Sequence, residues 1–356
     1  MRNEREAAGG LSFPDGQGVL LGRAMTGTTM HAAETIFAAE EARRAVNLKR
    51  FITSDAVVRR LTRIAAITVL ALLAGVMIAL VQGAAPALKL FGFSFLTTEV
   101  WNPVTEKFGA LAPIYGTLVT SAIAMLIAVP FGIGIAVFLT ELCPRFLRRP
   151  IGIAIELLAG IPSIIFGIWG LFVLAPFLQQ HVQPGIIELF GNVPFLNQVF
   201  AGPPYGIGVL TAGVILAFMV LPFISSIARD VFETVPPVLK ESAYALGCTT
   251  SEVVRNVVLP YTRSGVIGGV MLGLGRALGE TMAVTFVIGN AHSISASILA
   301  PGTTISASIA NEFTEAVGDI YTSALIALGL ILFVITFGVL AVARYLLLRL
   351  ERRAGN

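Results

Sequence analysis

The chain has 356 residues, of which 56% are hydrophobic and 13% are charged, and its mean hydropathy is +0.85. This composition excludes an ordinary soluble globular protein and indicates that a lipid bilayer is the solvent. The net charge is only +3, and the basic residues form no basic face, which argues against nucleic acid as a partner.

The first predicted domain is an N-terminal extension, residues 1–50. Glycines recur from Gly9 to Gly22, which predicts a flexible, partly disordered start on the cytoplasmic side. The pattern from Ala32 to Asn47 is compatible with an amphipathic helix on the membrane surface or with a short solvated helix. The extension lacks the apolar stretch of a cleavable secretory signal, so insertion is expected to begin at the first apolar run.

The second predicted domain, residues 51–356, is a transmembrane domain. Its apolar runs each meet the length of about 20 residues that a spanning helix needs. They lie at 62–81, 113–140, 153–178, 205–228, 264–290 and 322–348. The fold class is therefore predicted to be all-α, a polytopic bundle of six transmembrane helices. Pro130, Pro162, Pro176 and Pro222 lie inside these runs and predict kinks.

The basic residues predict the orientation of the bundle. Most of the 24 lysines and arginines lie before the first run, in the second and fourth connections, or at the C-terminal end. Only Lys89 and Lys107 lie in the other three connections, and Arg276 lies alone inside a run. Because basic loops stay on the cytoplasmic side, both termini are expected to be cytoplasmic.

The cysteines and histidines predict neither a disulfide nor a metal site. Cys143 and Cys248 lie in connections expected to be cytoplasmic, where a structural disulfide is disfavoured, and neither has metal-ligand spacing. His31, His181 and His292 are scattered over a tail and two external connections. No two of them are placed to share a metal ion.

The fourth connection, at about 230–262, contains the signals of two helices. Pro236 and Pro237 suit a first helical turn, and Gly247 can end that helix in the left-handed conformation. Thr249 and Glu252 have the spacing of a capping box, which predicts a second helix returning to the membrane. From these signals alone, an ordinary helical hairpin and a docking elbow remain equally open.

The same connection resembles the "EAA" loop of ABC importer permeases. The matching residues are Glu241, Ser242, Ala243, Gly247, Val257, Leu259 and Pro260. Ser242 replaces the usual alanine and Val257 the usual isoleucine, and both changes are small in volume. The resemblance implies that the first helix is a coupling helix, which inserts into a groove on an ATPase subunit.

ATP chemistry is expected to reside in a partner. None of the four lysines follows a glycine, so the chain lacks the G-x-x-x-x-G-K-[ST] phosphate loop. Zinc-ligand spacing and the G-x-S-x-G arrangement are also absent from the sequence, which argues against an intramembrane enzyme. The chain is therefore predicted to be a non-catalytic subunit that binds no cofactor of its own.

The fifth run contains two charges, Arg276 and Glu280. At about 100° per residue they share a helix face with Gly265, Gly269 and Gly273, which predicts that this face meets another helix. A charge near the bilayer centre costs at least roughly 2.5–3.5 kcal/mol, so Arg276 should face protein or water. The pair either receives and releases an oxyanion on the planar guanidinium or forms a permanent clasp that fixes helix packing.

The stretch GLGRALGETMAVTFVIGN at 273–290 resembles the fifth helix of phosphate-specific ABC importer permeases, the PstC type. The resemblance extends from about Phe108 to Arg349. It implies a multi-pass subunit of the bacterial cytoplasmic (inner) membrane with Arg276 and Glu280 in the phosphate pathway. It also implies three partners: a second homologous permease subunit, a dimeric ABC ATPase that uses ATP, and an extracytoplasmic phosphate-binding protein.

Two alternatives remain for the function, a permease for another oxyanion and an ion-coupled secondary transporter. Two other polar features are assigned structural roles. Glu156 is expected to form an interfacial ion pair with Arg148 or Arg149. Hydroxyl groups in the second run are expected to hydrogen-bond along or between helices rather than to line a pore. They belong to Thr117, Thr120 and Ser121.

Overall fold

The computed structural model describes residues 57–354 apart from residues 192 and 195. Within these ranges the fold is all-α, with isolated β-bridges but no strand. Six helical runs are long and apolar enough to cross a membrane, which confirms the predicted number. They are Val57–Phe91, Leu111–Leu142, Ser163–Phe190, Val209–Glu233, Thr250–Leu278 and Asp319–Tyr345. The predicted extension, residues 1–50, lies outside the described residues.

The chain divides into two compact units, Met1–Val76 and Met77–Asn356. The described part of the first unit is the beginning of the helix Val57–Phe91. In the second unit, the remainder of that helix joins the core through Ser323, whose hydroxyl donates to the Gly83 carbonyl at 2.7 Å and accepts from the Ala87 N–H at 2.9 Å.

The second unit contains every labelled helix. Up to the third span these are α2 (Ser94–Thr97), α3 (Leu111–Val137), η1 (Phe138–Leu142), α4 (Arg145–Ala159), α5 (Ser163–Trp169), η2 (Gly170–Leu174), α6 (Ala175–Phe177), η3 (Leu178–Val182), α7 (Gln183–Phe190) and α8 (Leu196–Val199). The remaining helices are α9 (Val209–Glu233), α10 (Pro237–Ala245), α11 (Thr250–Val253), η4 (Val254–Val258), α12 (Leu259–Leu278), α13 (Met282–Thr285), α14 (Ile305–Glu312) and α15 (Asp319–Ala354).

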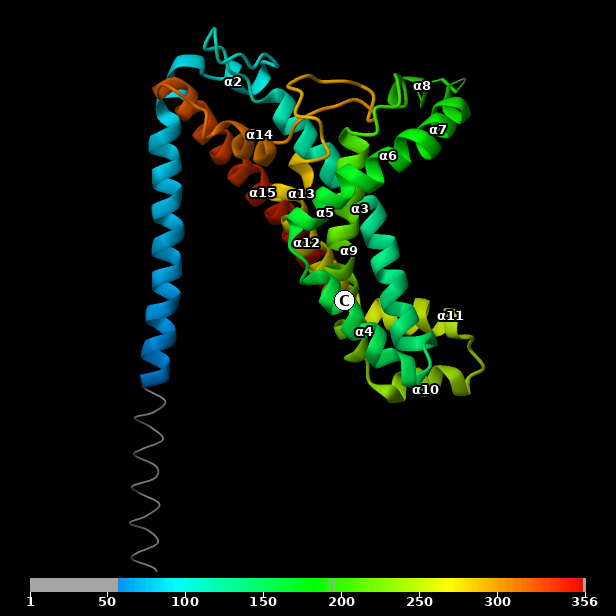
Figure 1. Cartoon of the computed structure of the whole chain (residues 1–356). Coiled ribbons are helices and arrows are strands. Elements are labelled where there is room, and N and C mark those ends of the chain that lie inside the picture. Colours follow the sequence, from blue (N-terminus) through cyan, green and yellow to red (C-terminus); the bar gives the residue numbers. More distant parts are fainter. Residues whose placement is uncertain (1–56, 192, 195, 355–356) are drawn as a thin grey trace, which may run out of the picture. The chain divides into compact units, whose positions relative to one another are not determined.

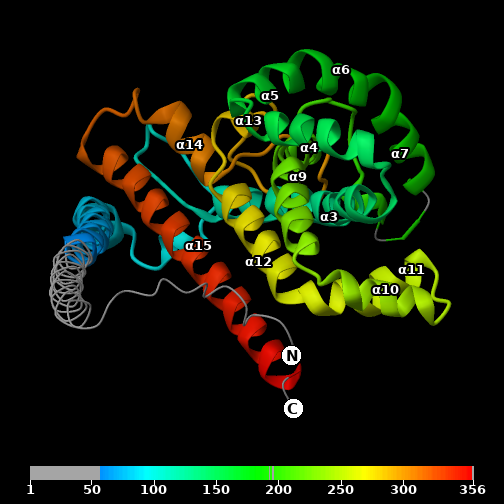
Figure 2. The same ribbon diagram turned by 90° about the horizontal axis from the view of Figure 1, so that it is seen from below.

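Helices α3 and α9 lie side by side at the centre of this unit, and α12 packs against both (Figures 1 and 2). Small residues permit the close approach: a Cβ added at Gly213 of α9 would lie 2.6 Å from a side-chain carbon of Ile123 on α3. Figure 1 places α10 and α11 at one end of the unit and α2, α7, α8 and α14 at the other. The bundle thus presents two ends with different structures.

The predicted third span, 153–178, is wrong in its position. Helix α4 ends at Ala159, and the spanning run begins at Ser163 and continues to Phe190. Pro162 causes the break because it restricts the residue before it to extended conformations and lacks an N–H donor. By contrast, Pro130 and Pro222 lie inside the continuous helices α3 and α9.

The predicted fifth span, 264–290, is also shifted. The helical run begins at Thr250 and ends at Leu278. Pro260 does not interrupt it, because the π-helical turn η4 directly before Pro260 already changes the backbone hydrogen-bond register. At the other end, Gly279 leaves the helical conformation, so Glu280 lies beyond the helix.

Two glycines of α3 offer a matched test of this packing. A Cβ at Gly116 would lie only 1.8 Å from the Thr303 carbonyl oxygen, whereas a Cβ at Gly134 meets nothing within 4 Å. We expect Gly116→Ala to destabilise the protein by about 1–3 kcal/mol through overpacking. Gly134→Ala should be neutral or slightly stabilising, because alanine favours the helix. Thermal unfolding of the purified variants in detergent measures the difference, and equal midpoints would contradict it.

Candidate functional site

The elbow between α9 and α12 begins with the short helix α10. Pro236 is its N-cap, and Pro237 occupies its first turn, as predicted. Gly247 has φ +88°, the left-handed conformation expected of a helix terminator. Its N–H donates to the Tyr244 carbonyl at 2.9 Å, and the Cys248 N–H donates to the Ala243 carbonyl at 3.2 Å. These two bonds form a Schellman motif, which fixes the end of α10.

The second arm of the elbow starts with the predicted capping box. The Glu252 N–H donates to Thr249 Oγ1 at 3.4 Å, and the Thr249 N–H donates to Glu252 Oε2 at 2.8 Å. The helical run then passes through Leu259 and Pro260 into α12. Leu259 packs against a buried cluster that includes Val235 and Val258. Both arms are therefore held to one small core.

Helix α10 has no buried residue. Glu241 and Ser242 are exposed, Ala243 is half-buried, and the large apolar side chains around them are exposed as well. These are Val238, Leu239, Tyr244 and Leu246. The Ser242 hydroxyl donates to the Val238 carbonyl of its own helix at 2.7 Å, so serine fits here without another partner. An exposed apolar patch on a rigid helix is typical of a protein-docking surface.

An ion pair of Lys240 joins α10 to the end of the second span. The Nζ atom of Lys240 lies 2.5 Å from Glu141 Oε1 in η1, and the Glu141 side chain is only 7% exposed. This ion pair could not be predicted from the sequence, because the two residues are 99 positions apart and lie in different connections. The contact supplies a direct mechanical link between the elbow and α3, which continues into η1.

The glycine face of α12 meets α9, as predicted. Cβ atoms added at Gly265, Gly269 and Gly273 would lie 2.6–2.9 Å from side-chain carbons of α9. The two charges do not share this contact. Arg276 is exposed near the end of α12, and Glu280 follows the helix.

The predicted placement of Glu280 one turn after Arg276 on the same helix is wrong, because α12 ends at Leu278. Glu280 Oε1 instead accepts from the Ala283 N–H at 3.3 Å, at the start of α13. Among the residues that the structure describes, Arg276 forms no ion pair. The guanidinium is thus exposed in the single chain, and its role in a pathway stays a prediction.

Residues 128–352 match the family described as binding-protein-dependent transport system inner membrane component. The chain belongs to this family. The match spans the elbow, Arg276 and Glu280, and most of the helical bundle.

Several relatives of this permease are called phosphate transport system permease protein PstC. The protein of Mesorhizobium japonicum is 70% identical over 92% of this chain and 100% of its own length. The protein of Haemophilus influenzae is 54% identical over 85% of this chain and 96% of its own length. A probable phosphate transport system permease protein PstC of Methanocaldococcus jannaschii is 41% identical over 75% of this chain and 85% of its own length.

Solved structures support the permease fold. A bacterial ABC transporter involved in the import of the acidic polysaccharide alginate matches with a TM-score of 0.56 and 19% identity, covering 85% of this chain and 99% of that chain. The same kind of transporter, in complex with an alginate pentasaccharide-bound periplasmic protein, matches with a TM-score of 0.51 and 20% identity, covering 75% and 87%. This likeness establishes the fold of the permease.

The remaining polar predictions for the permease have mixed outcomes. Thr117, Thr120 and Ser121 are buried and donate to carbonyls one turn earlier in α3, which confirms their structural use. Glu156 forms an ion pair, but its partner is Arg229 at 2.6 Å rather than Arg148 or Arg149. Helix α4 contacts α9, so the residue that reaches Glu156 comes from another helix.

At the opposite end of the permease, Glu312 joins three segments that are distant in sequence. Its carboxylate accepts from Trp101 Nε1 at 2.6 Å and from the Tyr321 hydroxyl at 2.7 Å, and it lies 2.7 Å from His292 Nε2. The His292 ring also stacks on Trp101. No role for His292 could be predicted from the sequence, because no neighbouring residue along the chain identifies its partners. Burial raises the pKa of Glu312, but the bonds from His292, Tyr321 and Trp101 outweigh burial and hold the pKa below its ordinary value.

Low pH should therefore reduce the stability of the folded permease at this end. A carboxyl group whose pKa is lowered by folding stabilises the folded state above its unfolded pKa and loses that contribution as the pH falls toward the folded value. We expect the thermal midpoint of the wild type to fall when the pH is lowered from neutral to below about 4. The midpoint of Glu312→Gln should fall by a few degrees less over the same pH change. Glu315→Gln, which changes an exposed neighbour, is the matched control and should retain the wild-type profile. Identical profiles for wild type and Glu312→Gln would contradict the role of Glu312.

Proposed function

We propose that the chain is a permease subunit of an ATP-driven phosphate importer and passes inorganic phosphate between its helices. The observation that carries the proposal is 70% identity to a phosphate transport system permease protein PstC over 92% of the chain. The exposed, firmly capped helix α10 supports the same class of transporter, because an ATP-driven importer needs a surface that receives motion from an ATPase. An ion-coupled secondary transporter has no need of such an elbow.

Arg276 is the residue that we place in the phosphate pathway. It is exposed in the single chain, yet a guanidinium within a membrane span has to face protein or water. A second homologous permease subunit facing α12 would enclose it in a polar passage. There the planar donor fork can contact two oxygens of phosphate. Glu280, held by the Ala283 N–H, lies next to this passage and limits how strongly the anion is retained.

The ATPase-coupling surface comprises α10 and the arm that follows it. Glu241, Ser242 and Ala243 lie on α10, Gly247 ends it, and Leu259 and Pro260 carry the chain into α12. A dimeric ABC ATPase docks here and hydrolyses ATP, while this chain is non-catalytic and binds no cofactor. The α10 end and both termini then face the cytoplasm of a bacterial inner membrane. The opposite end, with α2, α7, α8 and α14, receives an extracytoplasmic phosphate-binding protein.

Reconstitution tests this function. The chain, the second permease subunit, the ATPase and phosphate-loaded binding protein are placed in vesicles, and uptake of labelled phosphate and labelled sulfate is followed. Phosphate uptake should require hydrolysable ATP and should stop with a non-hydrolysable analogue. Uptake driven by an ion gradient without ATP would assign the chain to secondary transport, and preferential sulfate uptake would assign it to another oxyanion.

A further inference from the structure

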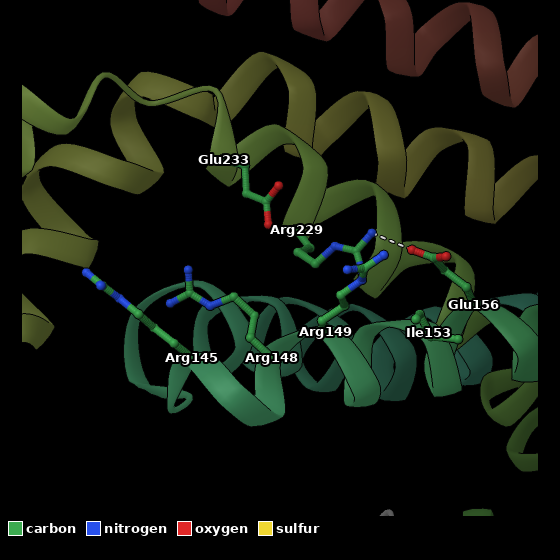
Figure 3. Close-up of a pocket in the computed structure, with 7 residues that line it drawn as sticks. All are labelled: Arg145, Arg148, Arg149, Ile153, Glu156, Arg229 and Glu233. Atoms are coloured by element: carbon green, nitrogen blue, oxygen red, sulfur yellow. Dashed lines mark hydrogen bonds and ion pairs between the residues drawn. The ribbon is translucent and has the colours of Figure 1, made fainter.

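A pocket rich in arginine lies between α4 and α9, separate from Arg276 and from the exposed surface of α10. Its volume is about 320 Å³. The lining residues are Arg145, Arg148, Arg149, Ile153, Glu156, Arg229 and Glu233. In Figure 3 Arg149 extends from α4 toward Arg229, which projects from α9 together with Glu233, while Arg145 points away from both. Four guanidinium groups and two carboxylates leave the lining with a positive excess.

The charges of this pocket are unevenly paired. Arg229 lies 2.6 Å from Glu156 and 2.9 Å from Asp230, so it is neutralised within the protein. The arginines of α4 form no ion pair with any residue in the described part of the chain; they are Arg145, Arg148 and Arg149. Three guanidinium groups on two adjacent turns repel one another, and an anion between them would relieve the repulsion.

Arg148 is already fixed in position. Its Nη2 donates to the Thr140 carbonyl at 2.6 Å, while its Nε is buried and has no hydrogen-bond partner among the described residues. A buried donor without a partner is unfavourable, and a charged oxygen is the strongest acceptor for it. Gly152 contributes space, because a Cβ there would lie 2.6 Å from Arg229 Nη1. The pocket therefore contains one buried guanidinium donor without a partner, although the carboxylates of Glu156 and Glu233 also line it.

Large apolar side chains of α4 are exposed beside the arginines. Phe146 is 76% exposed and Leu157 is 70% exposed, and Ile153 of the lining is also exposed. In a protein of the bilayer such side chains contact hydrocarbon, whereas the arginines at the start of α4 are suited to the headgroup region. A free inorganic anion would use only the arginines, but a phospholipid would use both sets of side chains.

We infer that the pocket between α4 and α9 binds a phosphate group and that this group is the headgroup phosphate of an anionic phospholipid. The arginines of α4 donate to its oxygens, and Phe146 and Leu157 contact its acyl chains. The site lies on α4, the segment between η1 and the third span, and η1 is also joined to α10 by Lys240 and Glu141. A lipid bound here therefore contacts the same end of the bundle that moves with the coupling helix.

Native mass spectrometry of the full chain tests the site. The chain is purified in mild detergent, supplied with phosphatidylglycerol or phosphatidylcholine, and the retained lipid is counted. Arg145→Gln with Arg149→Gln is the test variant, because both side chains are exposed and fix no other group of the described structure. Arg255→Gln with Arg263→Gln removes the same charge from exposed positions in the elbow and the start of α12 and is the matched control.

We expect the wild type and the control to retain one molecule of phosphatidylglycerol. The test variant should bind this lipid roughly twentyfold more weakly, because each arginine near an anionic headgroup raises the affinity about fivefold. Phosphatidylcholine should not replace this lipid, and millimolar inorganic phosphate should not displace it. Displacement by inorganic phosphate would overturn the lipid assignment in favour of free phosphate. Equal retention by the test variant and the control would overturn the site, and neither result depends on phosphate transport.

Discussion

Arg276→Gln is expected to lower ATP-dependent phosphate uptake at least tenfold while the importer still assembles. Arg276 is exposed and makes no ion pair among the described residues, so replacing it by glutamine breaks no ion pair of the described fold. Hydrogen bonds to a charged group contribute roughly 1.5–3 kcal/mol each. Losing one or two of them from the passing anion should lower uptake at least tenfold. Labelled phosphate uptake measures the effect, and co-purification of the ATPase reports assembly.

Two further variants test whether the effect is specific to the guanidinium group of Arg276. Arg276→Lys keeps the positive charge but loses the planar fork, so it should retain intermediate uptake. Arg344→Gln removes an exposed arginine of α15 and should retain wild-type uptake. Undiminished uptake by Arg276→Gln, with assembly intact, would exclude the pathway role and leave Arg276 as a packing or topology residue.

The elbow was predictable from the sequence because its determinants are local. Gly247 adopts the left-handed conformation and Thr249 pairs with Glu252, and each of these features depends on residues within one or two turns. The six spans were predictable for a similar reason, since apolar length alone identifies a spanning helix. Helix caps and the length of an apolar run do not depend on how the helices pack, so the sequence alone is sufficient to predict them.

The predicted bounds of the third and fifth spans were wrong because hydropathy alone does not determine where a helix ends. The apolar run at 153–178 is continuous in hydropathy, but Pro162 divides it into α4 and a spanning helix. The run at 264–290 stays apolar after Gly279, although the helix has ended. Hydropathy measures the preference for lipid, whereas the helix boundary depends on backbone conformation and on what packs beyond it. The assignment of Glu280 to the same helix as Arg276 failed for this reason.

Ion pairs between residues that are distant in the sequence could not be predicted. Lys240 meets Glu141, Glu156 meets Arg229, and His292 meets Glu312. Glu141 and Glu156 each have arginines nearer in the sequence, at Arg145, Arg148 and Arg149, and only the packing of helices decides which basic residue each carboxylate meets. The ion pair of Lys240 matters most for function, since it joins a helix that has no buried residue to the end of the second span.

Gly247→Val is expected to uncouple the transporter from its ATPase. Gly247 has φ +88°, a conformation that a β-branched residue adopts at a cost of about 1–3 kcal/mol. Valine should therefore shift the turn and break the Schellman bonds that end α10. The added side chain meets no clash, because a Cβ at this position has nothing within 4 Å. The expected effect comes from backbone strain and not from bulk, and it should lower phosphate uptake and ATPase co-purification about tenfold.

A matched pair of variants separates strain at the elbow from general destabilisation. Gly247→Asn should retain much of the activity, because asparagine tolerates the left-handed conformation. Gly318 has φ +96° and equally open surroundings, but it precedes α15 at the opposite end of the bundle. Gly318→Val should therefore lose comparable thermal stability and keep the ATPase bound. If Gly247→Val binds the ATPase as firmly as Gly318→Val does, α10 is not the surface through which ATP hydrolysis moves this permease.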